Sequence, residues 1–129
     1  LNKDTMELTY SNSGIHIPPL LSTAENEISS LTASSLPISS AFDIKSLEIA
    51  EDSFKLAPNN SLLITTDGLI EEVHGEELYG RERLAWLFEE YANLSAQEIS
   101  QEIKRDFKDF TGDLESQDDI TFLIIKYQN

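Results

Sequence analysis

The sequence predicts an α+β domain in which antiparallel strands form sheet and a pair of helices packs on one sheet face. Three observations carry this prediction. The first half of the chain has short apolar segments punctuated by turns, two amphipathic helical segments follow between residues 80 and 112, and an apolar stretch closes the chain at residues 120–127. Strands grouped ahead of a helix pair are typical of a layered α+β domain.

The chain is acidic and has no cysteine. Its 129 residues, the size of one ordinary domain, include 9 Lys plus Arg and 24 Asp plus Glu, a formal net charge of −15. This charge disfavours DNA, RNA and anionic lipid as partners, and the lack of cysteine excludes disulfides and thiolate metal sites. No apolar run reaches the roughly 18 residues of a spanning helix, so we expect no membrane insertion and a cytoplasmic location. Because the chain opens Leu-Asn-Lys-Asp, with neither an initiator Met nor a signal peptide, we expect its start to be a cut.

Residues 1–60 show the pattern of strands and turns. Pro18 and Pro19 exclude a helix where they stand, and residues 57–60, Ala-Pro-Asn-Asn, are typical of a turn. Strands or strand edges are expected at residues 6–9, 44–49 and 54–56. Two further short strands are expected around a turn near Pro37, where the apolar residues are Ile28, Leu31, Leu36 and Ile38. We therefore expect a β-rich first half.

Two strands that each border an acidic residue organise the chain. Leu62, Leu63 and Ile64 are consecutive apolar residues, which predicts a strand covered on both faces, and this strand leads to Asp67. The strand at 120–127 instead follows an acid, Asp118. If the two strands are antiparallel neighbours, or face each other across two sheets at the same rim, both carboxylates lie within a few ångströms of each other, although they are far apart in the sequence. Carboxylates that close need a shared proton or a bound cation, and we favour the cation.

Two amphipathic helices are predicted between these strands. The first opens at Gly80 and places apolar residues at helical spacing: Leu84, Leu87, Phe88 and Tyr91. The second opens with Ser95 and Glu98, which form a capping box, and ends at Gly112. Its apolar stripe is Ile99, Ile103, Phe107 and Phe110. Trp86 is expected in the core together with these stripes.

Four groups of residues, in this order, resemble a known family. They are Ser11-Asn-Ser-Gly14 with His16 and residues 18–21 (Pro-Pro-Leu-Leu), Thr66-Asp67-Gly68-Leu69 with Glu71, residues 77–80 (Glu-Leu-Tyr-Gly) with Arg83-Leu84, and Asp118-Asp119-Ile120-Thr121. Together they resemble the later motifs of bacterial PPM-type, metal-dependent serine/threonine protein phosphatases of the stage II sporulation protein E-like branch. The resemblance covers nearly the whole chain.

The resemblance implies a fold and a metal site. The fold is a four-layer αββα sandwich of two antiparallel sheets, with Mn²⁺ or Mg²⁺ bound at one rim between the sheets and two cations per complete domain. On this reading Asp67 and Asp118 are metal ligands, with Gly68 and Asp119 as supporting positions behind them. For Asp119 a simple solvated charge is an equally good interpretation. No side chain is expected to act as a catalyst beyond the metal-bound water.

The chain also departs from the family pattern. No residues match the family's first metal motif, Gly-Asp-x-x-Gly-His-Gly, so residues 1–129 are interpreted as the C-terminal portion of a single phosphatase domain with an incomplete metal site. An additional residue lies between Gly14 and His16, Ser39 stands where the family tends to have Gly, and Asn59-Asn60 replaces Gly-Asp. These departures affect loops and leave both ligand positions intact.

The implied function is metal-dependent hydrolysis of phosphoserine or phosphothreonine on a regulatory protein, such as an anti-sigma-factor antagonist, under an upstream sensor or regulatory domain. A phosphate monoester needs charge neutralisation and an activated water, and oxygen-ligated Mn²⁺ or Mg²⁺ supplies both. This chain alone is expected to be inactive. The alternative is a non-catalytic acidic interaction module that keeps the phosphatase fold.

Other polar residues have plainer interpretations. A lone Asp at a strand end most often only forms a turn or caps a helix, and the flanking motifs favour the metal interpretation for Asp67 and Asp118. His16 is interpreted as a turn residue and His74 as exposed. The acidic pairs at 71–72, 76–77 and 89–90 are interpreted as solvated faces, with a weak extra cation site as the alternative for the first two pairs.

Overall fold

The computed structural model describes residues 1–25, 27–39 and 48–128 and contains three helices and eight strands in these ranges. The strands are β1 (Glu7–Ser11), β2 (Leu20–Ser22), β3 (Ile28–Ser30), β4 (Glu51–Lys55), β5 (Ser61–Thr65), β6 (Val73–His74), β7 (Glu77–Leu78) and β8 (Phe122–Lys126). The helices are α1 (Asp67–Ile70), α2 (Arg81–Glu90) and α3 (Ala96–Thr111). The α+β class predicted from the sequence is confirmed.

The main sheet has four strands in the order β3-β2-β5-β8, and every neighbouring pair is antiparallel. β5 and β8 pair along their whole length, from Ser61 opposite Lys126 to Thr65 opposite Phe122. The condition set from the sequence, that these two strands are antiparallel neighbours, is therefore met. The end of β5 and the start of β8 lie at one edge of the sheet, which we call the rim.

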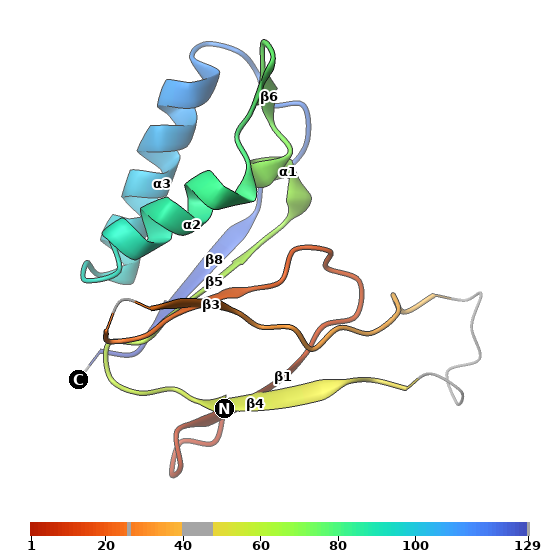
Figure 1. Ribbon diagram of the computed structural model, residues 1–129, viewed down its shortest axis with the longest axis vertical. Coiled ribbons are helices and arrows are strands. Elements are labelled where there is room, and N and C mark those ends of the chain that lie inside the picture. The colour runs from red at the N-terminus through yellow and green to blue at the C-terminus, as the bar shows by residue number, and fades with distance from the viewer. Residues whose placement is uncertain (26, 40–47, 129) are drawn as a thin grey trace.

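Helices α2 and α3 cover one face of this sheet (Figure 1). The consecutive apolar residues of β5 point to alternate faces, as strand geometry requires, and Leu63 points to the helices. There it joins a core cluster of ten buried residues in the described part of the chain: Leu20, Leu63, Leu69, Ile70, Tyr79, Leu84, Leu87, Phe88, Ile99 and Ile103. This cluster fixes the helix pair on the sheet.

The opposite face is covered by the two-stranded sheet β1-β4, which lies on the other side of β5 from the helices in Figure 1. Leu62 faces this way, and with Leu21 and Leu31 it forms a second, smaller buried cluster. Tyr10 of β1 and Phe54 of β4 pack against the cluster and meet each other edge to face. β5 is thus covered on both faces, as predicted, and the described residues form a helix layer and two sheet layers.

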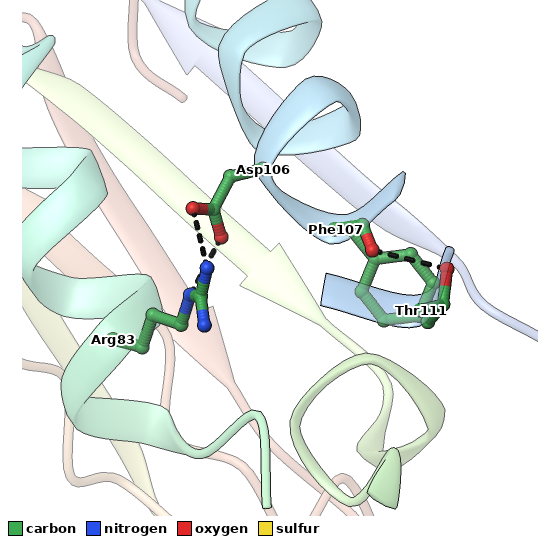
Figure 2. Close-up of polar contacts among 4 residues, drawn as sticks. All are labelled: Arg83, Asp106, Phe107 and Thr111. Atoms are coloured by element: carbon green, nitrogen blue, oxygen red, sulfur yellow. Dashed lines mark hydrogen bonds and ion pairs between the residues drawn. The ribbon is translucent and has the colours of Figure 1, made fainter. Parts of the chain in front are cut away.

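The predicted start of α2 and both predicted ends of α3 are confirmed, and Tyr91, the last residue of the predicted stripe of α2, lies just beyond that helix. Gly80 precedes α2, Gly112 follows α3, and the Ser95 hydroxyl and Glu98 carboxylate form the predicted capping box. The Arg83 guanidinium joins the two helices by donating two hydrogen bonds, each 2.8 Å, to the Asp106 carboxylate (Figure 2). Such two-point pairs fix orientation as well as distance.

Tyr79 anchors the segment before α2 in the helix-face core. Its ring is 2 % exposed, packs edge to face on Phe107 and Phe110, and lies under the Arg83 guanidinium. Burial raises the pKa of the Tyr79 hydroxyl far above its ordinary value, and the Asp106 carboxylate adds to the rise. No hydrogen bond of ordinary geometry satisfies this hydroxyl in the described structure.

Several local predictions are wrong. Of the two short strands expected around Pro37, the first is present as β3 at Ile28–Ser30, whereas the second is absent: Leu36 and Ile38 lie in no strand, and Ser35 only makes an isolated bridge with Ser13. Of the expected strand at 44–49, residues 44–47 lie outside the described residues and 48–49 are not in a strand, whereas the edge expected at 54–56 falls at the end of β4. Trp86 is 57 % exposed, because the buried stripe of α2 runs through Leu84 and Leu87 and leaves the position between them on the outer face.

Candidate metal centre

The rim carries the two predicted carboxylates. Beyond the last residue of β5, the Thr66 amide donates to the Thr121 carbonyl (3.0 Å) and the Thr121 amide donates to the Thr66 hydroxyl (3.1 Å). These bonds extend the pairing of the two strands to the residue before Asp67. Asp67 then opens helix α1, and Asp118 lies on the loop that enters β8. The sheet register thus brings the two acids to the same edge.

Gly68 lets helix α1 approach the loop that carries Asp118. A Cβ atom placed on Gly68 would lie 2.6 Å from the Asp119 carbonyl oxygen and 3.5 Å from the Asp118 Cβ. The first distance is too short for any real side chain, so the residue after Asp67 has to be glycine for the two segments to meet this closely. Close backbone approach, rather than a positive φ, accounts for this glycine.

Both carboxylates are held by the amide of the residue that follows them. Asp67 Oδ1 accepts a hydrogen bond from the Gly68 amide at 3.1 Å, and Asp118 Oδ1 accepts one from the Asp119 amide at 2.7 Å. An ionised carboxylate has about four acceptor positions, so each retains capacity for a further ligand. Asp67 is half-buried and Asp118 is exposed, which leaves the pair accessible from solvent.

A pocket of about 270 Å³ opens beside the rim and is lined by Gly68, Glu71, Glu72, Gln117 and Asp118. Its walls come from α1 with the segment after it, and from the loop before β8. A liquid water occupies about 30 Å³, so the pocket has room for several water-sized groups. Three of its five lining residues are acidic, which suits a cation.

The burial of Glu72 differs from what the sequence predicts. The sequence indicates a solvated face, but the residue is only 4 % exposed, and its Oε2 accepts a hydrogen bond from the Gln117 amide at 3.1 Å. Its neighbour Glu71 is exposed, as expected. A glutamate pair in a polar stretch of sequence is typical of solvent exposure. Glu72 is buried because a loop 45 residues further along the chain contacts it, and the local sequence does not indicate that contact.

The residues at the rim fit part of a site for a hard divalent cation. Asp67 and Asp118 provide oxygen donors, the type that Mn²⁺ and Mg²⁺ prefer, and Gly68 provides the close approach that brings their segments together. No group of three or more His, Asp or Glu side chains in the described part of the chain is arranged to hold a metal ion. The rim therefore offers an incomplete ligand set.

The other predicted positions lie as follows. The Asp119 side chain is exposed, and this residue contacts α1 through its backbone carbonyl at Gly68. His16 lines a different pocket, with Asn12 and Pro37 among its neighbours. The turn around His16 is fixed by Asn12, whose side chain donates to the Ile15 carbonyl (2.7 Å) and accepts from the Ile15 amide (3.0 Å). His74 is exposed and its ring meets Phe110 edge to face.

Comparison with known families identifies the family of this chain. The family model described as stage II sporulation protein E (SpoIIE) matches residues 1–128. The chain belongs to the SpoIIE family. The resemblance noted in the sequence motifs is thereby confirmed.

Solved structures share the fold of this SpoIIE family member. The SiaA-PP2C domain of Pseudomonas aeruginosa matches with a TM-score of 0.79 at 19 % identity, covering 98 % of this chain and 49 % of that one. A structure of RsbU and RsbW domains from Mycobacterium tuberculosis matches with 0.73 at 25 % identity, covering 99 % and 34 %. The PP2C phosphatase domain with a fragment of the regulatory domain of SpoIIE from Bacillus subtilis matches with 0.65 at 17 % identity, covering 93 % and 34 %.

The chain thus spans half or less of the length of these three structures. No curated protein matches it significantly. None of the helices in residues 1–25, 27–39 and 48–128 has the length and apolar character needed to cross a bilayer.

Proposed function

We propose that this chain is the C-terminal portion of a PPM-type (PP2C) protein phosphatase domain, in which Asp67 and Asp118 bind Mn²⁺ or Mg²⁺ for the hydrolysis of phosphoserine or phosphothreonine on a regulatory protein. One observation carries the proposal. The antiparallel register of β5 and β8 puts the segments of Asp67 and Asp118 at one rim, and Gly68 lets them approach to backbone contact.

The family and its structures support a phosphatase reaction in general. The family model covers nearly the whole chain, and the SiaA and SpoIIE structures are named as PP2C domains. A structure of the Bacillus subtilis SpoIIE phosphatase domain was presoaked with Mn, which supports the choice of cation. The match to RsbU and RsbW domains, and to a SpoIIE structure with a regulatory-domain fragment, supports a regulatory protein substrate and a regulatory domain in the parent protein.

The residues of this chain have defined tasks in the proposed reaction. Asp67 and Asp118 would hold the cation, and the amides of Gly68 and Asp119 each donate to one oxygen of these carboxylates and leave the other free to bind it. When bound, the cation would supply charge neutralisation for the phosphoryl group and lower the pKa of a water. The pocket lined by Gln117 and Asp118 beside the rim gives access from solvent.

Two carboxylates are too few to hold the cation pair of a complete site, so we propose that the chain alone is inactive. A ligand from an upstream segment of the same domain completes the set. The alternative is a non-catalytic acidic interaction module. One observation supports it: the net charge is −15, and two ligand carboxylates account for only a small part of that charge.

A phosphopeptide release assay with and without chelator separates these functions. It compares this chain, the complete protein that contains it, and the complete protein with Asp67→Ala or Asp118→Ala. We expect chelator-sensitive hydrolysis by the complete protein only, lowered by several orders of magnitude in either variant. Glu89→Ala, which removes one exposed charge from α2, is the matched control and keeps full activity. Full activity in both aspartate variants, or no activity in the complete protein, would favour the module.

A further inference from the structure

Glu72 is a buried carboxylate that lies between the two segments of the rim. It follows α1 directly after Glu71, and its side chain reaches the loop that carries Asp118. Burying an ionised carboxylate is costly unless hydrogen bonds replace its water. The Gln117 amide supplies such a bond to Glu72 Oε2 at 3.1 Å, and hydrogen bonds to an ionised acceptor are stronger than those between neutral groups.

The backbone around Glu72 is firmly held. The Glu72 carbonyl accepts a hydrogen bond from the Tyr79 amide at 2.9 Å, and the Ile70 carbonyl accepts one from the Gly80 amide at 2.9 Å. Tyr79 and Ile70 both belong to the helix-face core cluster. The Glu72 carboxylate is therefore presented from a fixed position.

The loop that carries Asp118 has less support of its own. Residues 112–119 are exposed and belong to no helix or strand. Within this loop, the residues on both sides of Asp118 are held by the α1 segment: the Gln117 amide by Glu72, and the Asp119 carbonyl by its close approach to Gly68. The Gln117 side chain adds a weaker bond to the Val73 carbonyl at 3.4 Å. Contacts on the residue before Asp118 and on the residue after it thus bracket one proposed ligand.

We propose that Glu72 is a positioning residue for the candidate metal centre: by accepting the Gln117 amide, it holds Asp118 at the separation from Asp67 that the cation requires. This inference rests on the proposed function, because it gives Asp118 the role of a ligand. Glu72 acts through its acceptor oxygen and does not itself bind the metal. Groups that orient metal ligands typically change metal affinity or activity by 10–100-fold when removed.

The test is a Mn²⁺ titration of the complete protein by calorimetry, with hydrogen exchange of the Gln117 amide as a second readout. Glu72→Met keeps the volume and removes the acceptor, whereas Glu72→Gln keeps an acceptor oxygen and removes the charge. We expect Glu72→Met to weaken Mn²⁺ binding about 10–100-fold and to speed exchange at Gln117, and Glu72→Gln to stay within about threefold of the wild type on both readouts. Glu89→Ala, an exposed charge removal on α2, controls for net charge.

Three results would overturn the inference. Wild-type Mn²⁺ affinity in a folded Glu72→Met variant would make Glu72 merely structural, and an equal loss in Glu72→Gln would show that the charge acts rather than the hydrogen bond. If Glu72→Met does not fold, Gln117→Pro removes the same bond from the other side, and unchanged affinity there would also contradict the inference. Failure of the proposed function is distinct, because Asp67→Asn/Asp118→Asn would then leave Mn²⁺ binding unchanged whatever Glu72 does.

Discussion

The two faces of strand β5 pack against buried clusters of different size. On the helix face, Leu63 is 1 % exposed and belongs to a cluster that draws residues from the sheet, α1, α2 and α3. On the opposite face, Leu62 is nearly as buried, at 3 %, but its cluster contains two other buried residues, Leu21 and Leu31. Further along the same face, Leu123 of β8 is 53 % exposed.

This difference shows which part of the structure places the rim. The helix face joins β5, α1 and the segment before α2 into one core. The rim residues Asp67, Gly68 and Glu72 lie within two positions of Leu69 and Ile70, which belong to that core. The buried cluster on the face toward β1-β4 packs against β5, but the residues that form it in the described structure include none from α1. The position of the proposed ligands therefore depends on the helix face more than on the second sheet.

The largest expected effect is that of Leu63→Ala. This variant opens a cavity in the helix-face cluster, where close-packed neighbours on three helices limit relaxation. We expect the free energy of unfolding to fall by about 4–5 kcal/mol, the upper part of the range for buried leucines. Urea unfolding followed by circular dichroism measures it. A loss below about 2 kcal/mol would show that this face is less tightly packed than described.

Leu62→Ala is the matched variant on the other face, with the same substitution one residue earlier in the same strand. Its neighbours Ile64 and Ile125 are only partly buried and can move into the space that is lost. We expect a loss of about 2–3 kcal/mol, the lower part of the same range. If Leu62→Ala costs as much as Leu63→Ala in the same urea experiment, the two faces are equivalent and the comparison fails.

Tyr79→Phe tests the helix-face core through pH. The native pKa of Tyr79 is raised by burial, so the unfolded chain loses this proton near pH 10 while the native state retains it. Stability from this group is present below pH 10 and declines above it, by up to about 1.4 kcal/mol per pH unit. The variant lacks this decline. The gap between the two unfolding free energies should change from pH 9 to pH 11, and a constant gap would mean that Tyr79 is solvated.

The smallest expected effect is that of Leu123→Thr on the thinly covered face. The side chain is 53 % exposed, and Thr introduces a β-branched side chain of the kind that suits a strand. We expect a change within about 0.5 kcal/mol, the usual range for surface substitutions. A loss above about 2 kcal/mol in thermal unfolding of this chain would show that another surface covers Leu123.

The sequence predicts those elements whose signal is local. Three consecutive apolar residues predict β5, and Ser95, Glu98 and Gly112 mark the ends of α3 directly. β2 was not predicted, because it is three residues long and is defined by pairing with β3 and β5. The hairpin β6-β7 was missed for a similar reason: its strands have two residues each, and all four side chains are exposed, so no apolar alternation reveals them.

The same distinction applies at the rim. Asp67 and Asp118 could be proposed from sequence because each borders an apolar strand, and antiparallel pairing then brings them to one edge. Helix α1 and the burial of Glu72 could not. Helix α1 has only four residues, too few for an apolar period, and the burial of Glu72 depends on the loop before β8 returning to the end of β5 after two intervening helices.

The central claim is that Asp67 and Asp118 share one cation at the rim. A calorimetric titration of Mn²⁺ into this 129-residue chain and into its Asp67→Asn/Asp118→Asn variant tests it most directly, because substitution by asparagine preserves shape while removing charge. We predict weak binding at fewer sites than the two of a complete domain, and its loss in the double variant. Weak binding that is unchanged in the double variant, or tight binding of two Mn²⁺ ions by this chain alone, would contradict the claim.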